Sequence, residues 1–165
     1  PREEAAAIPS YEIRLIELLV AYPELRPYAA QYVLPIHATA PPIRTCLEVL
    51  LEEGDAKDTD ARLLGKIPQG AEAAKKLMTE RMFSATPIIG SDLDTPEQAL
   101  QGVIRRVRLS HMGDMQQGIQ VRIAAAQGSA RDDVELEHMR VGMIIGHLRD
   151  VKRKWEDIAP LLRLQ

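Results

Sequence analysis

The sequence predicts an all-α protein, in which a compact bundle of short helices is followed by a long helix and a C-terminal helical hairpin. Apolar residues make up 45% of the 165 residues but aromatic residues only 4%, so Leu, Ile, Val, Met and Ala must fill the core. That composition favours packed helices over a sheet sandwich or barrel. Prolines break the first 95 residues into short segments, whereas none lies between Pro96 and Pro160.

The first expected helix follows Pro9, with Ser10 as its N-cap, and it ends at Pro23. Its sequence is strongly apolar, and Glu12 and Glu17 belong to a narrow charged stripe between the apolar positions.

Four more short helices are expected before residue 95. One begins with Pro23 at its first turn and ends before Pro35, and another follows Pro41-Pro42. Two others are expected over 58–65 and 70–83, and the segment 84–94 reads as a loop. We therefore expect residues 1–95 to form a globular helical subdomain.

Residues 96–165 are expected to form a second subdomain that begins with a long helix. Thr95 is the expected N-cap, Pro96 takes the first helical position, and Gln98 completes a capping box. The apolar residues that follow repeat at about 3.6 residues as far as about residue 127. A helix of ~30 residues spans ~45 Å, so part of it must project beyond the globule or be covered by another element.

A second long helix is expected from about Ser129 to about Trp155. Two long helices joined by a short loop are antiparallel neighbours, which gives the hairpin. Its expected apolar face includes Val134, Leu136, Met139, Met143, Ile144, Leu148 and Val151. Glycines inside the two helices indicate close packing between the arms or, alternatively, local flexibility. They are Gly102, Gly113, Gly118, Gly142 and Gly146.

The residue pattern offers no catalytic, cofactor-binding or metal-binding site. The four histidines have no metal-ligand spacing, and the motifs of nucleophilic enzymes and phosphate-binding loops are missing. Cys46 lies in an apolar run and is expected to be a small buried hydrophobe. We therefore expect that this chain is not itself an enzyme and that it takes no cofactor.

Charge and hydropathy restrict the partners and the compartment. The net charge of −3 is a poor match for a nucleic acid backbone. The basic cluster Arg105, Arg106 and Arg108 is expected to be a solvated face or to contact the acidic first half, with weak nucleic acid contact as the alternative. No stretch approaches the ~20 apolar residues of a membrane span, and no signal peptide is found, so a cytoplasmic protein is expected. The start at Pro1 suggests a fragment of a longer chain.

One motif carries a family resemblance. The run IELLVAYPEL, from Ile16 to Leu25, resembles the "LLxLLLxHPEL" opening of the C-terminal domain of bacterial DNA primase of the DnaG type, with Ala21-Tyr22 where a His commonly precedes Pro-Glu. The expected layout of short helices, a long helix and a terminal hairpin is also similar to that domain.

The resemblance implies a helicase-binding module. In that family the domain docks onto the amino-terminal domains of the replicative hexameric helicase (the DnaB-type hexamer) and couples primer synthesis to the replication fork. The full-length parent would be a primase, a DNA-dependent RNA-polymerizing nucleotidyltransferase, whose zinc-binding and polymerizing domains lie upstream. The alternative from the residues alone is a small helical nucleic-acid-binding domain that uses the cluster Arg105–Arg108.

The hairpin is the expected partner-binding region, because too little globule lies nearby to bury its apolar residues. Charged neighbours are expected to fix the orientation of the partner, although the two arms must bury part of this set against each other. The candidate partner-binding residues are Ile119, Arg122, Ile123, Arg131, Val134, Met139, Arg140 and Met143. The chain is expected to be a monomer, or a domain-swapped dimer in a crystal.

Overall fold

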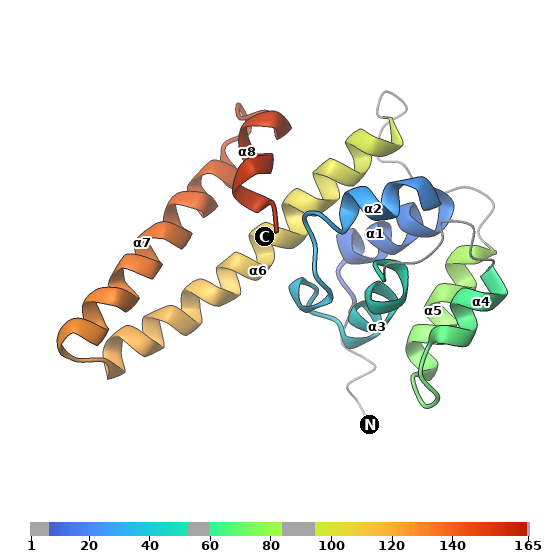
Figure 1. Cartoon of the computed structure of the whole chain (residues 1–165), viewed down its shortest axis with the longest axis horizontal. Helices are drawn as coiled ribbons and strands as arrows, with labels where there is room; N and C mark the ends of the chain where they lie inside the picture. The colour runs from blue at the N-terminus through green and yellow to red at the C-terminus, as the bar shows by residue number, and fades with distance from the viewer. Residues whose placement is uncertain (1–6, 53–59, 84–94, 165) are drawn as a thin grey trace. The chain divides into compact units, whose positions relative to one another are not determined.

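The fold was obtained as a computed structural model that describes residues 7–52, 60–83 and 95–164. These residues form helices and no strand, which confirms the predicted all-α class (Figure 1). They divide into two units, which are described one at a time. The first comprises the described residues up to Val107 together with Leu164, and the second comprises Arg108–Arg163.

The first unit contains seven short helical elements and the beginning of a long helix. In chain order these are α1 (Ser10–Ala21), η2 (Pro23–Leu25), α2 (Arg26–Ala29), η3 (Pro35–His37), α3 (Pro41–Leu50), α4 (Asp60–Lys66), α5 (Glu72–Met82) and the start of α6 (Pro96–Ala125).

Helix α1 is central to the core of this unit. It packs against both α3 and α5, which also pack against each other. Four α1 side chains, those of Leu15, Ile16, Leu18 and Leu19, are completely buried. Burying a leucine or isoleucine side chain contributes about 1.5–3 kcal/mol, so this one helix supplies a large share of the apolar stabilisation.

Prolines set the helix boundaries in the first unit much as expected. Helix α1 ends before Pro23, and α3 begins at Pro41. The prediction of Ser10 as an N-cap is wrong, because Ser10 is already helical and its side chain makes no capping hydrogen bond. The expected helix over 70–83 is shorter, at Glu72–Met82. Residues 58 and 59 of the helix expected over 58–65, and the expected loop 84–94, lie outside the described residues.

The predicted start of α6 is confirmed in detail. The backbone N–H of Gln98 donates to Thr95 Oγ1 at 3.1 Å, and the backbone N–H of Thr95 donates to Gln98 Oε1 at 3.0 Å. This reciprocal pair is a capping box. The division between the units lies inside α6, after Val107, rather than between residues 95 and 96. The physical reason is that Leu100, Ile104 and Val107 of the first turns are buried in the first unit.

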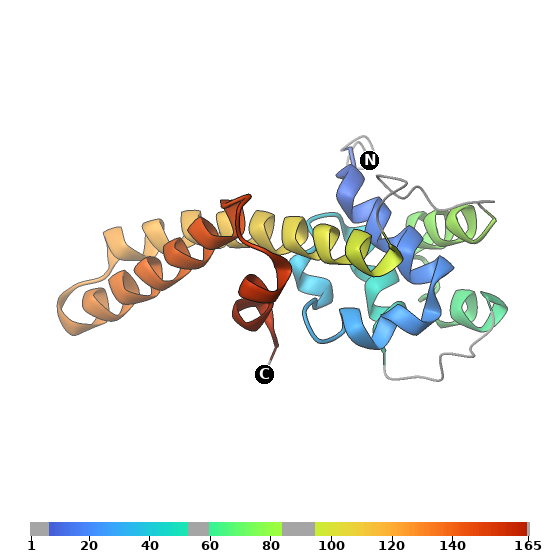
Figure 2. The ribbon, with the colours of Figure 1, turned by 90° about the horizontal axis from the view of Figure 1, so that it is seen from above.

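The second unit contains the rest of α6, α7 (Gly128–Arg149) and α8 (Trp155–Leu162). Helix α6 remains helical through Gly113 and Gly118. Helices α6 and α7 run antiparallel and side by side in both views (Figures 1 and 2). The chain reverses over residues 126–127, and Gly128 has a φ of 63°, a backbone conformation that glycine adopts readily.

The predicted extent of the second long helix is wrong, because α7 ends at Arg149 and not near Trp155. Asp150 is extended, and its Oδ1 accepts a hydrogen bond from the backbone N–H of Lys152 at 3.0 Å. Such a side-chain turn competes with helix continuation. Helix α8 then begins, with Asp157 Oδ2 accepting from the backbone N–H of Lys154 at 3.3 Å.

Candidate functional site

The two glutamates of the charged stripe on α1 are buried. Glu12 is 1% exposed, and its Oε1 accepts hydrogen bonds from the backbone N–H groups of Thr39 and Ala40, both at 3.1 Å. Its Oε2 accepts from Thr39 Oγ1 at 2.7 Å. These residues immediately precede α3, so the carboxylate lies where the dipole of that helix favours a negative charge. Glu12 is therefore a structural cap that ties α1 to the start of α3.

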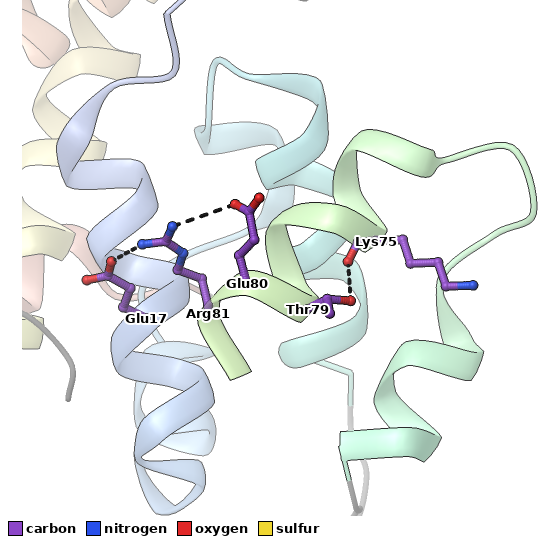
Figure 3. A network of polar contacts seen from close by, with 5 residues as sticks. All are labelled: Glu17, Lys75, Thr79, Glu80 and Arg81. Carbon is purple, nitrogen blue, oxygen red and sulfur yellow. Dashed lines mark hydrogen bonds and ion pairs between the residues drawn. The ribbon is translucent and has the colours of Figure 1, made fainter. Parts of the chain in front are cut away.

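Glu17 has a similar structural role toward α5. Its Oε1 lies 2.5 Å from Arg81 Nη1, and Arg81 Nη2 lies 3.7 Å from Glu80 (Figure 3). Nearby, Thr79 Oγ1 donates to the backbone carbonyl of Lys75 at 2.8 Å. A buried carboxylate is stabilised by a charged hydrogen-bond donor, whereas burying an unpaired carboxylate costs free energy. This pairing joins α1 to α5.

Cys46 is buried, as expected, and its thiol lies 3.5 Å from the backbone carbonyl of Ala74. Burial raises the pKa of the thiol to about 12, so it stays protonated at neutral pH. A protonated buried thiol is a poor nucleophile.

The expected basic cluster does not present three guanidinium groups to solvent. In the first unit Arg106 is exposed and lies over the ring of Tyr11 at 4.9 Å. In the second unit Arg108 is 8% exposed, and its Nη1 donates to the backbone carbonyl of Leu162 at 2.6 Å. Burial lowers the pKa of Arg108. Arg108 therefore anchors the end of α8 and is not a surface site for phosphate.

The interface between α6 and α7, which we call the hairpin interface, is marked by two contacts. Arg122 Nη2 lies 3.2 Å from Glu137 Oε2, and a Cβ added at Gly142 would lie 3.5 Å from Gln116 Nε2. From Val141 onward α7 carries a buried row at spacings of four and three residues, which is one face of a helix. The row comprises Val141, Ile145 and Leu148.

A second apolar row, which we call the outer stripe, lies on the opposite face of α7. It consists of Leu136, Met139 and Met143, which are 55%, 66% and 66% exposed. At about 100° per residue these side chains point roughly 180° away from the middle of the buried row. The predicted apolar face combined the outer stripe with Leu148 of the buried row, and that assignment is wrong, because the two lie on opposite sides of α7.

The structure separates the candidate partner-binding residues into three groups. Ile119 is buried, and Ile123 and Val134 are half-buried. Arg122 and Arg131 form ion pairs with Glu137 and Glu135, at 3.2 Å and 2.9 Å. Only Met139, Arg140 and Met143 are exposed together on the outer side of α7.

Leu136 belongs to this surface and was not among the candidate residues. Its spacing of three and seven residues from Met139 and Met143 is the signal that identifies it. The outer stripe thus brings one unpredicted residue together with two predicted ones.

The expected close packing around the glycines is wrong at most positions. Only Gly142 has a neighbouring atom within 4 Å of an added Cβ; Gly102, Gly113, Gly118 and Gly146 have none. The hairpin interface also buries two polar atoms, Gln116 Oε1 and His138 Nε2, that have no hydrogen-bond partner among the described residues. The contact between α6 and α7 is therefore not tightly optimised.

No protein-family model matches the chain, and no curated protein or solved structure matches it either. In residues 7–52, 60–83 and 95–164, His, Cys, Asp and Glu form no group of three or more that could hold a metal ion. No helix in the described part of the chain is both long and apolar enough to cross a membrane.

Proposed function

We propose that this chain is a non-catalytic protein-interaction domain of a bacterial DNA primase, and that it binds the replicative hexameric helicase through the α6–α7 hairpin. Binding couples primer synthesis to the advancing replication fork. The proposal assigns recognition to the outer stripe of α7 and a supporting role to the first unit.

The observation that carries the docking role is the outer stripe itself. Three large apolar side chains, Leu136, Met139 and Met143, face solvent along one side of a helix. An exposed apolar row of this kind is typical of a surface that another helix covers. Methionine side chains are flexible and polarizable, which suits them to an interface that must adapt to its partner.

The helicase as the partner rests on the resemblance of the segment Ile16–Leu25 to the opening of the primase C-terminal domain. In the structure this segment includes the end of α1 and η2, so it contributes to the core of the first unit and not to the outer stripe. The segment therefore supports the proposed primase family, and the outer stripe supports the proposed contact with the helicase.

A double substitution tests the proposal. Met139→Glu with Met143→Glu places two charges on the outer stripe, and both positions are exposed, so the fold is retained. We expect the variant to lose at least tenfold in affinity for a DnaB-type helicase, because burying unpaired charges at an interface is costly. Affinity is measured by isothermal titration calorimetry with the purified hexamer.

Val121→Glu is the matched control. Val121 is 71% exposed, lies on α6 of the same unit, and is not part of the outer stripe. It should leave the affinity unchanged within about twofold. Equal affinity of the double variant and the unmodified chain, or failure of the unmodified chain to bind the helicase, contradicts the proposal. Affinity for DNA that falls steeply with salt favours instead the nucleic-acid-binding alternative.

A further inference from the structure

The outer stripe has the spacing of a coiled-coil contact surface. Leu136, Met139 and Met143 follow one another at three and four residues, and Gly146 continues the row three residues later. A row with this alternation matches a second helix that lies nearly parallel or antiparallel to the first. A Cβ added at Gly146 would meet no atom within 4 Å, so this end of the row has open space.

Charge along α7 is polarised from one end to the other. Its first half carries Asp132, Asp133, Glu135 and Glu137 against Arg131, whereas its second half carries Arg140 and Arg149 without any acidic residue. An antiparallel helix with the same distribution would set acidic residues beside basic ones. A parallel copy would place like ends together.

A second copy of α7 offers both a matching apolar row and, when antiparallel, a complementary distribution of charge. If two α7 helices lie antiparallel about a two-fold axis at the level of Val141, Met139 of one copy faces Met143 of the other. Leu136 then faces the open space at Gly146, and Glu135 lies on the same side as Arg149 of the second copy. Each contact occurs twice, as in any isologous dimer.

We propose that two copies of this chain associate through their outer stripes, with the α7 helices antiparallel and Leu136 seated at Gly146 of the second copy. Three apolar side chains from each copy cover less than a standard interface, so the association is weak, with a dissociation constant on the order of 100 µM. The dimer covers the outer stripe while no other partner is bound. This inference does not depend on the helicase being the partner.

One residue limits the strength of this dimer. Arg140 is exposed beside the outer stripe and lies within one residue of the proposed axis. The two symmetry-related guanidinium groups therefore approach each other, and like charges at an interface are unfavourable. Arg140→Gln removes the repulsion.

Sedimentation velocity of the full chain over about 10 µM to about 1 mM tests the pairing. We expect a reversible monomer–dimer equilibrium. Glu135→Arg and Arg149→Glu should each weaken it by roughly tenfold, because each change acts twice. The variant with both changes should dimerise within about threefold of the unmodified chain, and Arg140→Gln should dimerise about threefold more tightly. Glu156→Arg, at an exposed position of α8, is the matched control and should change nothing.

A chain that remains monomeric at the highest concentration overturns the inference. So does a dimer that both single charge reversals leave unchanged, which is the result expected of a domain-swapped dimer. An Arg140→Gln variant that dimerises no more tightly contradicts the axis at Val141, and with it this pairing. Helicase binding is measured separately, so a monomeric chain that binds helicase refutes only the dimer, and a dimeric chain that does not bind refutes only the proposed function.

Discussion

The first unit is distinguished by two buried carboxylates, and the second by a row of exposed apolar side chains on one helix. The first unit buries the carboxylates of Glu12 and Glu17, and each has charged or hydrogen-bonding partners at 2.5–3.2 Å. The second unit leaves Leu136, Met139 and Met143 exposed, yet it buries two polar atoms without partners in its hairpin interface. The first unit also buries Arg81 Nε without a hydrogen-bond partner among the described residues, so the units differ in their bonded carboxylates and in their exposed apolar row, and not in unsatisfied polar atoms alone.

This difference separates a unit built for stability from one built for contact. A buried and fully bonded carboxylate favours one arrangement of helices, because any other arrangement leaves the buried charge without its hydrogen-bond donors. An exposed apolar row adds little to the stability of its own fold, but it stabilises a complex when a partner buries it. We infer that mutations in the first unit mainly change stability, whereas mutations on the outer stripe mainly change binding.

The sequence supplies a separate probe for each unit. The single cysteine, Cys46, lies in the first unit, and the single tryptophan, Trp155, lies in the second. Burial raises the pKa of the Cys46 thiol to about 12, so the thiol reacts with an alkylating reagent only when the first unit opens. Thiol labelling and tryptophan fluorescence therefore report on the two units independently.

The largest expected loss of stability follows removal of the Glu12 carboxylate. Glu12→Ala leaves the N–H groups of Thr39 and Ala40 without their acceptor and should lower the free energy of unfolding of the first unit by about 3 kcal/mol. Urea unfolding followed by Cys46 labelling measures this change. Glu48→Ala, at an exposed position on α3, is the control. A loss no larger than that of the control shows that Glu12 is not a structural cap.

The ion pair of Glu17 with Arg81 has the next largest expected effect. Arg81→Met leaves a buried carboxylate without its cation and should destabilise the first unit by about 2 kcal/mol. The double variant Glu17→Leu with Arg81→Met should recover most of that loss, because no lone charge remains. A double-mutant cycle with Cys46 labelling measures the coupling. Strictly additive losses in that cycle rule out a direct interaction.

These structural glutamates show where sequence patterns are insufficient. The period of α1 correctly predicts a helix, and prolines correctly mark its end and the start of α3. Yet the stripe of Glu12 and Glu17 gives no indication of burial, because that depends on Thr39 and Arg81, which are far away in the chain. The capping box of Thr95 and Gln98 was predictable because all of its parts are local.

The candidate site was also predicted only in part, because some of its features are local in the sequence and others depend on a neighbouring helix. Its place on the hairpin follows from helix length and spacing, and Met139 and Met143 were identified from their apolar character. Leu136 was assigned to the same face as Leu148, because a helix that is apolar on two sides has no single face in its pattern. Only the position of α6 beside α7 shows which row is covered. The end of α7 at Asp150 depended on a side-chain turn that the charge pattern does not reveal.

The stability of the second unit can be raised by replacing a glycine in one of its helices. Gly118 is exposed on α6, and an added Cβ meets no atom within 4 Å. Gly118→Ala should therefore stabilise the second unit by about 0.5–1 kcal/mol, the usual gain in a helix interior. Thermal unfolding followed by Trp155 fluorescence measures the gain. A loss of stability instead shows that the glycine is required by a conformation that this structure does not contain.

The smallest expected effect lies on the outer stripe and tests the comparison most directly. Met143→Ser removes an apolar side chain that is 66% exposed, so the unfolding of the second unit should change by less than about 0.5 kcal/mol. Met78→Ser, at a completely buried position of α5, makes the same chemical change and should cost the first unit about 3 kcal/mol or more. Fluorescence and thiol labelling during urea unfolding give the two values. A large loss from Met143→Ser means that the chain itself covers the outer stripe in solution, and the surface that we assign to a partner is then part of the core of the hairpin.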